Sequence, residues 1–252
     1  YNALLNSSSE EVINFDNVIA VNQNSTSPYT GGGAFNGMLI GSNGYRNDNV
    51  NRAVLVRRAS MNSHNWVGGI STLDITSGKF RYSAGIDLRS YTGFHYRALE
   101  NLMGLDGYFS TGNQNSLGQI QNVTISASPF RNTGLEREKI DYFNTGIVGW
   151  QGFNGLIEYN DEVSFTAVLQ GGISNQSFKR EDFFDQPNNP ISETKNITGG
   201  YVKGGANYNF DAKSNVFFNA GYISRQPLFD AVFPGFANDI NENLQNEEIV
   251  SV

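Results

Sequence analysis

The side chains that could act in catalysis or hold a metal are few in this sequence of 252 residues. It contains no Cys and only two His, His64 and His95, which excludes thiolate nucleophiles and leaves too few imidazoles for most zinc or haem sites. No Gly-x-Ser-x-Gly elbow is present. Asp141 and Glu158 are carboxylates that could flank a glycosidic bond, but nothing fixes their separation. We therefore expect no catalytic residue, metal site or cofactor, and we predict that the protein is not an enzyme.

Two further sequence features could suggest a ligand site but are better explained as surface loops. Residues 31–33 are three consecutive glycines without the strand-to-helix context of a phosphate loop, which favours a flexible surface loop. Asp239, Glu242, Glu247 and Glu248 form an acidic stretch. A solvated loop is the default interpretation of that stretch, and contact with a divalent cation is the weaker one.

The charge balance excludes one class of partner. Lys and Arg number 17 against 24 Asp and Glu, a formal net charge of −7, and no basic stripe occurs. Binding to nucleic acid phosphates is therefore not expected. No run of 18 apolar residues is present, so no transmembrane helix is predicted.

The elements that must position any site are strands, because apolar and polar residues alternate over long stretches. In residues 79–91 the even positions are mostly apolar and the odd positions mostly polar. A period of two places the two sets on opposite faces of a sheet. The same pattern predicts strands at approximately 65–75, 79–97, 146–159, 163–178, 196–210, 215–225 and 249–252. A short helical turn is expected at residues 98–102.

The connections between these strands alternate between short and long. Residues 76–78, 160–162 and 211–214 form tight turns, whereas 1–64, 97–145, 179–195 and 226–248 form long loops. Short turns at one end and long loops at the other are typical of a transmembrane β-barrel. Charged groups on the polar side of residues 79–89 suit a wet lumen better than a sealed core. Aromatic residues near the strand ends suit an interfacial girdle. They are Phe80, Tyr91, Phe94, Tyr96, Tyr159, Phe178, Tyr208 and Phe210.

Three stretches carry a resemblance to a known family: Ala59-Ser-Met-Asn-Ser-His-Asn-Trp66, residues 85–97 ending in Gly-Phe-His-Tyr-Arg, and Asn219-Ala-Gly-Tyr-Ile-Ser-Arg-Gln-Pro-Leu-Phe-Asp230 followed by Asp239-Ile-Asn-Glu-Asn. With these residues, the sequence resembles the barrel region of TonB-dependent outer-membrane receptors, particularly the SusC-like and OAR-like proteins of Bacteroidota. The similarity extends through most of the chain.

The resemblance implies a 22-stranded barrel closed by an N-terminal plug, which imports a bulky nutrient with energy passed on by TonB. It implies residence in the bacterial outer membrane and contact with lipid. The partners that it suggests are a SusD-like surface lipoprotein or other outer-membrane proteins. Residues 1–252 are expected to be one partial barrel of about six to seven strands, without the plug. The nutrient stays open among glycan, peptide and metal chelate.

Alternation and the resemblance together predict three groups of residues. Those expected to face the lumen and plug are Lys79, Arg81, Asp87, Arg89, Gln170, Lys203, Asn207, Asn219 and Arg225. Those expected to face lipid are Phe80, Tyr82, Ile86, Leu88, Phe165, Leu169, Val202, Tyr208, Phe218 and Tyr222. Extracellular-loop aromatics that could contact the ligand are Tyr29, Phe35, Tyr45, Tyr108, Phe109, Phe183, Phe184, Phe229, Phe233 and Phe236.

Two other functions are compatible with the same residues. A receptor-like barrel could serve as a structural or assembly subunit of a larger outer-membrane complex. A soluble all-β carbohydrate-binding module would also alternate, and it would place Phe80, Tyr82 and Phe218 in a dry core.

Overall fold

The computed structural model describes residues 56–104, 108–110, 113–114, 119–121, 123–125 and 139–252, together with Ile13, Phe15, Asp16 and Ile19. Its strands are β1 (Arg57–Ser77), β2 (Phe80–Asn101), β3 (Tyr108–Ser110), β4 (Gln119–Gln121), β5 (Ile140–Asn160), β6 (Phe165–Asp182), β7 (Lys195–Asn209), β8 (Asn215–Arg225) and β9 (Glu247–Ser251). Short helical turns, α2 (Phe229–Val232) and η3 (Pro234–Phe236), lie between β8 and β9.

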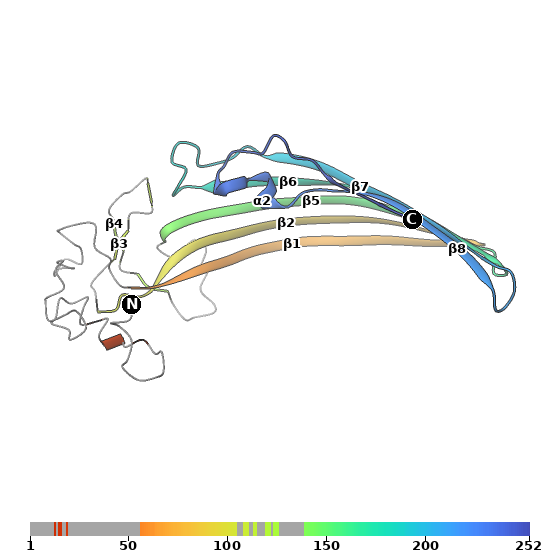
Figure 1. Ribbon diagram of the computed structural model, residues 1–252, viewed down its shortest axis with the longest axis horizontal. Coiled ribbons are helices and arrows are strands. Elements are labelled where there is room, and N and C mark those ends of the chain that lie inside the picture. The colour runs from red at the N-terminus through yellow and green to blue at the C-terminus, as the bar shows by residue number, and fades with distance from the viewer. Residues whose placement is uncertain are drawn as a thin grey trace. The chain divides into compact units, whose positions relative to one another are not determined.

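Seven of these strands form one antiparallel sheet in the order β1-β2-β5-β6-β7-β8-β9. Figure 1 shows β1, β2, β5 and β6 side by side. The short strands β3 and β4 form a separate antiparallel pair. An all-β fold with antiparallel strands is thereby confirmed. The sheet is not closed, because β1 and β9 each have a single neighbour among the described strands.

Several strands are longer than the alternation predicted. β1 begins at Arg57 instead of residue 65, and β5 begins at Ile140 instead of residue 146. The helical turn expected at residues 98–102 is wrong, because β2 continues to Asn101. Ala98 and Leu99 are buried at 1% and 0% exposure, and Leu99 bridges to Thr124. Tertiary burial therefore overrides the weak local helical preference.

The chain divides into two compact units. One, the loop unit, comprises Tyr1–Ser63, Phe94–Asn144 and Asp182–Pro190. The other, the sheet unit, comprises His64–Gly93, Thr145–Glu181 and Ile191–Val252. Within the described residues, no helix has the length and apolar character needed to cross a membrane.

The turn between β5 and β6 is organised by one carboxylate. Asp161 Oδ1 accepts hydrogen bonds from the backbone N–H groups of Val163, Ser164 and Phe165 at 2.9, 2.7 and 2.8 Å. These bonds favour the ionised form and lower the pKa of Asp161 from 3.8 to about 2. An Asx-type turn of this kind satisfies N–H groups that the strand ladder leaves unpaired.

This turn predicts a specific pH dependence. Because the folded pKa is lowered, the turn's contribution to stability is complete above the unfolded value of 3.8 and is lost as the pH falls through about 2. We expect Asp161→Ala to lower the thermal unfolding midpoint at neutral pH and Asp161→Asn, which keeps an acceptor but cannot ionise, to lower it less. The difference between wild type and Asp161→Asn should shrink as the pH falls from 4 to 2. A constant difference across this interval would contradict the assignment.

Candidate functional site

The long sheet has two chemically different faces, and the strand register assigns the residues to them. Directly opposed residues of neighbouring strands point to the same side of a sheet. Gln170 of β6 pairs with Lys203 of β7, and Gly205 of β7 pairs with Asn219 of β8. On the other side, Phe165 pairs with Tyr208. We call the first side the polar face and the second the apolar face.

The same two faces continue across β1, β2 and β5 in the sheet unit. Arg81 Nη2 lies 3.1 Å from Asp74 Oδ1, and Arg81 Nη1 lies 3.7 Å from Glu158 Oε2, so these three residues share the polar face. The Phe80 ring contacts the Tyr159 ring with centroids 5.0 Å apart, which joins the apolar sides of β2 and β5.

The structure places the two predicted strand sets on these opposite faces. Eight of the nine residues expected to face the lumen lie on the polar face, namely Arg81, Asp87, Arg89, Gln170, Lys203, Asn207, Asn219 and Arg225. Lys79 lies in the turn before β2. The apolar face holds Phe80, Tyr82, Ile86, Leu88, Phe165, Leu169, Val202, Tyr208, Phe218 and Tyr222. Their contacts with plug and lipid stay predictions.

Charged groups on the polar face pair with one another. Arg89 donates to both carboxylate oxygens of Asp87, at 2.8 and 2.5 Å. Arg225 pairs with Glu247 across β8 and β9. Together with the Arg81 pairs, these contacts pair three arginines of the polar face with four carboxylates, and most of these side chains are accessible to solvent.

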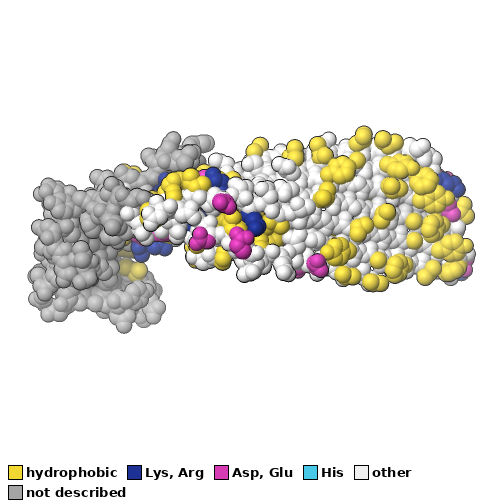
Figure 2. All heavy atoms as spheres, turned by 90° about the horizontal axis from the view of Figure 1, so that it is seen from above, with side chains coloured by type: hydrophobic (Ala, Val, Ile, Leu, Met, Phe, Trp, Pro, Cys, Tyr) yellow, Lys and Arg dark blue, Asp and Glu magenta, His cyan; other side chains and the backbone are white. Residues whose placement is uncertain are grey.

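The apolar face is apolar over only part of each strand. On β6 the apolar-face residues of segment 165–173 include Phe165, Leu169 and Ile173, whereas Asn175 and Ser177 follow on the same side. On β2 the apolar run ends at Leu88, before Ser90. Leu88 is 52% and Ile173 60% exposed. Figure 2 shows hydrophobic side chains spread over the strands with few charged side chains among them. We call the apolar part of this face, which covers segment 165–173 on β6 and ends at Leu88 on β2, the apolar band.

Aromatic rings gather at the turn end of the apolar band. Tyr159 contacts both Phe80 and Phe165, and Tyr208 contacts Phe210, with ring centroids 5.0 to 6.2 Å apart. The girdle expected at the other end is not formed by Phe94, Tyr96 and Phe178, which are buried at 9%, 0% and 1% exposure.

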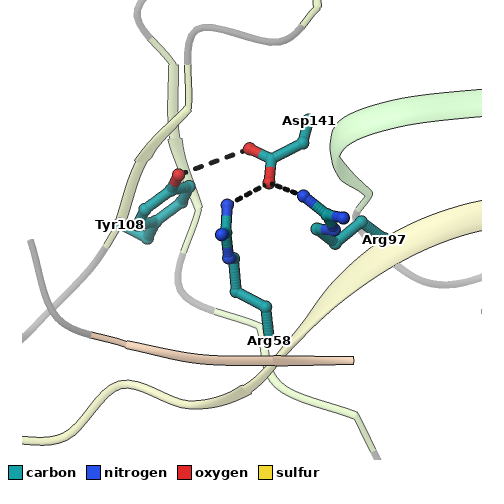
Figure 3. Close-up of polar contacts among 4 residues, drawn as sticks. All are labelled: Arg58, Arg97, Tyr108 and Asp141. Carbon is teal, nitrogen blue, oxygen red and sulfur yellow. Dashed lines mark hydrogen bonds and ion pairs between the residues drawn. The ribbon is translucent and has the colours of Figure 1, made fainter. Parts of the chain in front are cut away.

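In the loop unit, three side chains converge on Asp141 at the start of β5. Arg58 Nη1 and Arg97 Nη1 lie 2.5 and 3.1 Å from Asp141 Oδ2, and the Tyr108 hydroxyl donates to Oδ1 at 3.3 Å (Figure 3). Asp141 has φ 62°, a left-handed conformation that Asp tolerates better than most residues. The cluster joins β1, β2, β3 and β5. Burial and the Asp141 carboxylate raise the pKa of the Tyr108 phenol.

A second feature of the loop unit is a lysine beside two aromatic rings. Lys139 Nζ lies 4.4 Å from the Phe143 ring centroid and 5.4 Å from that of Tyr96. Burial lowers the pKa of Lys139. The rings pack with Phe94 and Ala98 in the hydrophobic cluster of this unit. A cation held against aromatic faces in this way stabilises the unit.

The loop aromatics predicted to contact ligand have different environments. Tyr29, Phe35 and Tyr45, together with the side chain of Phe109, lie outside the described part of the chain. Phe184 and Phe233 are buried at 8% and 3% exposure, and Phe229 is half-buried. Tyr108 is bound to Asp141. Phe183 and Phe236 are accessible, at 44% and 83% exposure.

Among the described residues, no group of three or more His, Asp or Glu side chains could hold a metal ion. His64 stacks on Tyr91 with ring centroids 6.0 Å apart. In the acidic stretch, Glu242 lies 3.6 Å from Lys195, and Glu248 accepts a hydrogen bond from Tyr222. Asp141 and Glu158 are each paired with Arg side chains.

Sequence reasoning missed the Asp141 cluster. Arg97 and Arg58 lie 44 and 83 positions before Asp141 in the sequence. No local pattern connects residues that far apart. Comparisons with known proteins identify no matching family model, curated protein or solved structure. The resemblance to TonB-dependent receptors therefore rests on the sequence stretches quoted above.

The Asp141 cluster predicts how the loop unit responds to loss of one charge. We expect Asp141→Asn, which tolerates the left-handed backbone, to destabilise this unit by on the order of 1 kcal/mol, because two arginines lose their shared carboxylate. Limited trypsin proteolysis between β2 and β5 should become faster.

The control for this experiment is Glu100→Gln, which weakens a more exposed ion pair with Arg57. We expect little change in cleavage rate, because exposed pairs contribute little. Equal acceleration in both variants would contradict the role given to Asp141.

Proposed function

We propose that this chain forms part of the wall of a transmembrane β-barrel in a bacterial outer membrane, and that the barrel belongs to a TonB-dependent importer of a bulky nutrient. In this proposal the apolar face contacts lipid and the polar face lines the passage. The plug, TonB and a surface lipoprotein are part of the proposal only because of the family resemblance.

The observation that carries the proposal is the apolar band. Large apolar side chains stay exposed on one face of the sheet, among them Val202 at 50% and Phe218 at 61%. On β6 the band occupies the nine residues 165–173. Nine residues span about 30 Å along a strand, or about 23 Å of depth at a tilt of about 40°. That depth is close to the hydrocarbon core that such barrels cross.

The strand lengths and turns support the same proposal. β6 has 18 residues and β2 has 22, so each strand continues well beyond the band. About 9 to 11 residues are enough to cross the membrane. The polar continuation would stand outside the membrane on the side of the long loops. The short turn end, with its aromatic cluster, would lie at the opposite interface.

The soluble module is the less favoured function. It requires Phe80, Tyr82 and Phe218 in a dry core, and their exposed fractions are 41%, 40% and 61%. Arg81 and Asp74 on the opposite face are also accessible, with side chains 54% and 46% exposed. Lipid on one side and water on the other accommodates both faces of the sheet.

A pair of arginine substitutions on β2 tests the lipid assignment. Ile86 lies in the apolar band, and Ser83 lies on the polar face of the same strand. We expect Ile86→Arg in the full-length polypeptide to destabilise the folded protein in bilayers by about 2–4 kcal/mol. Ser83→Arg should change its stability much less. The measurement is urea unfolding in lipid vesicles, and equal effects of the two variants would contradict the proposal.

The plug contact has its own test. Arg81→Glu combined with Arg89→Glu reverses two charges on the polar face and leaves the apolar band intact. We expect normal outer-membrane insertion and greater sensitivity of cells to vancomycin, because the plug is held less firmly. Unchanged antibiotic exclusion would count against a plug bound to this face.

A further inference from the structure

The connection between β8 and β9, residues 226–246, packs against the polar face of the sheet unit. Val232 and Phe233 are 0% and 3% exposed and form a hydrophobic cluster with Phe178 of β6. Val148 of β5 and Ile197 of β7 pack against this cluster. Phe178, Val148 and Ile197 all lie on the polar side of their strands, so this side becomes apolar where the connection covers it. We call residues 226–246 the inner loop.

Polar contacts fasten both ends and the middle of the inner loop. Gln226 Nε2 donates to the carbonyl and the hydroxyl of Ser174, at 3.1 and 2.8 Å. Asn246 Nδ2 donates to the Thr198 carbonyl at 2.8 Å. Arg180 is 3% exposed, and its Nη1 donates to Asn238 Oδ1 at 2.7 Å. Contacts from β6 and β7 thus hold the loop at three separate points.

Two glycines of the wall leave the space that the inner loop occupies. A Cβ atom at Gly146 would lie 3.0 Å from the Phe229 ring. A Cβ atom at Gly199 would lie 2.5 Å from Gln226 Cδ and 2.6 Å from the Ser224 carbonyl oxygen. Side chains at these positions would collide with the loop, so the wall and the loop are fitted to each other.

The inner loop presents one aromatic ring to solvent on an unfavourable backbone. Gly235 and Phe236 have φ of 66° and 60°, and Phe236 is 83% exposed. A left-handed backbone is unfavourable for Phe, and the exposed ring recovers little of that cost by burial. The buried anchors Val232 and Phe233 lie on the same short connection, separated from Phe236 by Pro234 and Gly235.

From these contacts we infer that the inner loop is a fixed constriction of the passage and that Phe236 is its rim residue. This inference rests on the proposed function, because only a barrel gives the polar face a passage to narrow. A loop fastened at three points, with Gln226, Asn238 and the anchors Val232 and Phe233 buried, stays against the wall. Solutes passing that part of the polar face would then meet the Phe236 ring, which limits their size and favours apolar surface.

The first experiment tests the packing of the loop. In the full-length polypeptide, with any other cysteines replaced, Val232→Cys should resist a water-soluble maleimide. Adding Gly146→Leu should make Cys at position 232 reactive, because the new side chain displaces Phe229. The matched control is Gly69→Leu, since a Cβ there meets nothing within 4 Å. Equal reactivity in all three backgrounds would overturn the inference.

The second experiment tests the place of Phe236 in the passage. Phe236→Gly removes the ring and suits the left-handed backbone, so the loop stays folded. All proteins are measured in the Arg81→Glu, Arg89→Glu background, because a firmly held plug would block the current. In that background we expect Phe236→Gly to give higher single-channel conductance in planar bilayers than the protein that keeps Phe236. The control is Phe210→Gly, an exposed ring beside the β7–β8 turn at 65% exposure, which should leave conductance unchanged. Equal conductance in the three proteins would overturn the role of Phe236.

These two results separate the inference from the proposed function. Protection of Val232→Cys in detergent depends only on loop packing, whereas conductance requires a membrane-spanning barrel. A protected loop in a polypeptide that fails to insert into bilayers would contradict the proposed function and the constriction together, while leaving the packing intact. An inserted polypeptide with a reactive Val232→Cys would contradict the constriction alone.

Discussion

The structure depends on the fixed register of long antiparallel strands. Because side chains alternate with a period of two, a slip of one residue between β6 and β7 would exchange the faces of Leu169 and Gln170. Such a slip would put Lys203 among apolar side chains and Val202 among charged ones. The separation of the two faces therefore both results from the register and stabilises it.

The polar face has two functions along its length. Near the short turns it carries ion pairs such as Arg81 with Asp74, which water can reach. Farther along, Phe178, Val148 and Ile197 give it an apolar surface on which the inner loop packs. One strand thus changes the chemistry of the same face between its halves. This change allows a sheet face that is otherwise polar and accessible to hold a folded connection without a separate core.

The sequence was sufficient to predict which face of a strand each side chain lies on, because side chains alternate between the two faces. Phe80 and Arg81, or Val202 and Lys203, had to lie on opposite faces wherever a strand formed. It was not sufficient for Phe178, which looked like a girdle residue but lies beneath the inner loop, or for residues 98–101, which extend β2. Arg58, Arg97 and Asp141 were also missed, because their convergence depends on how distant segments fold.

The most direct test of the proposal that the apolar band faces lipid is a spin-label scan along β6 of the full-length polypeptide in bilayers. Accessibility to oxygen should peak at odd positions from 165 to 173, and accessibility to a water-soluble quencher should peak at even positions in the same segment. Oxygen accessibility should fall at Asn175 and Ser177. A scan in which Phe165, Leu169 and Ile173 are shielded from both quenchers would contradict the membrane-spanning wall, because it would show a dry protein core on that face.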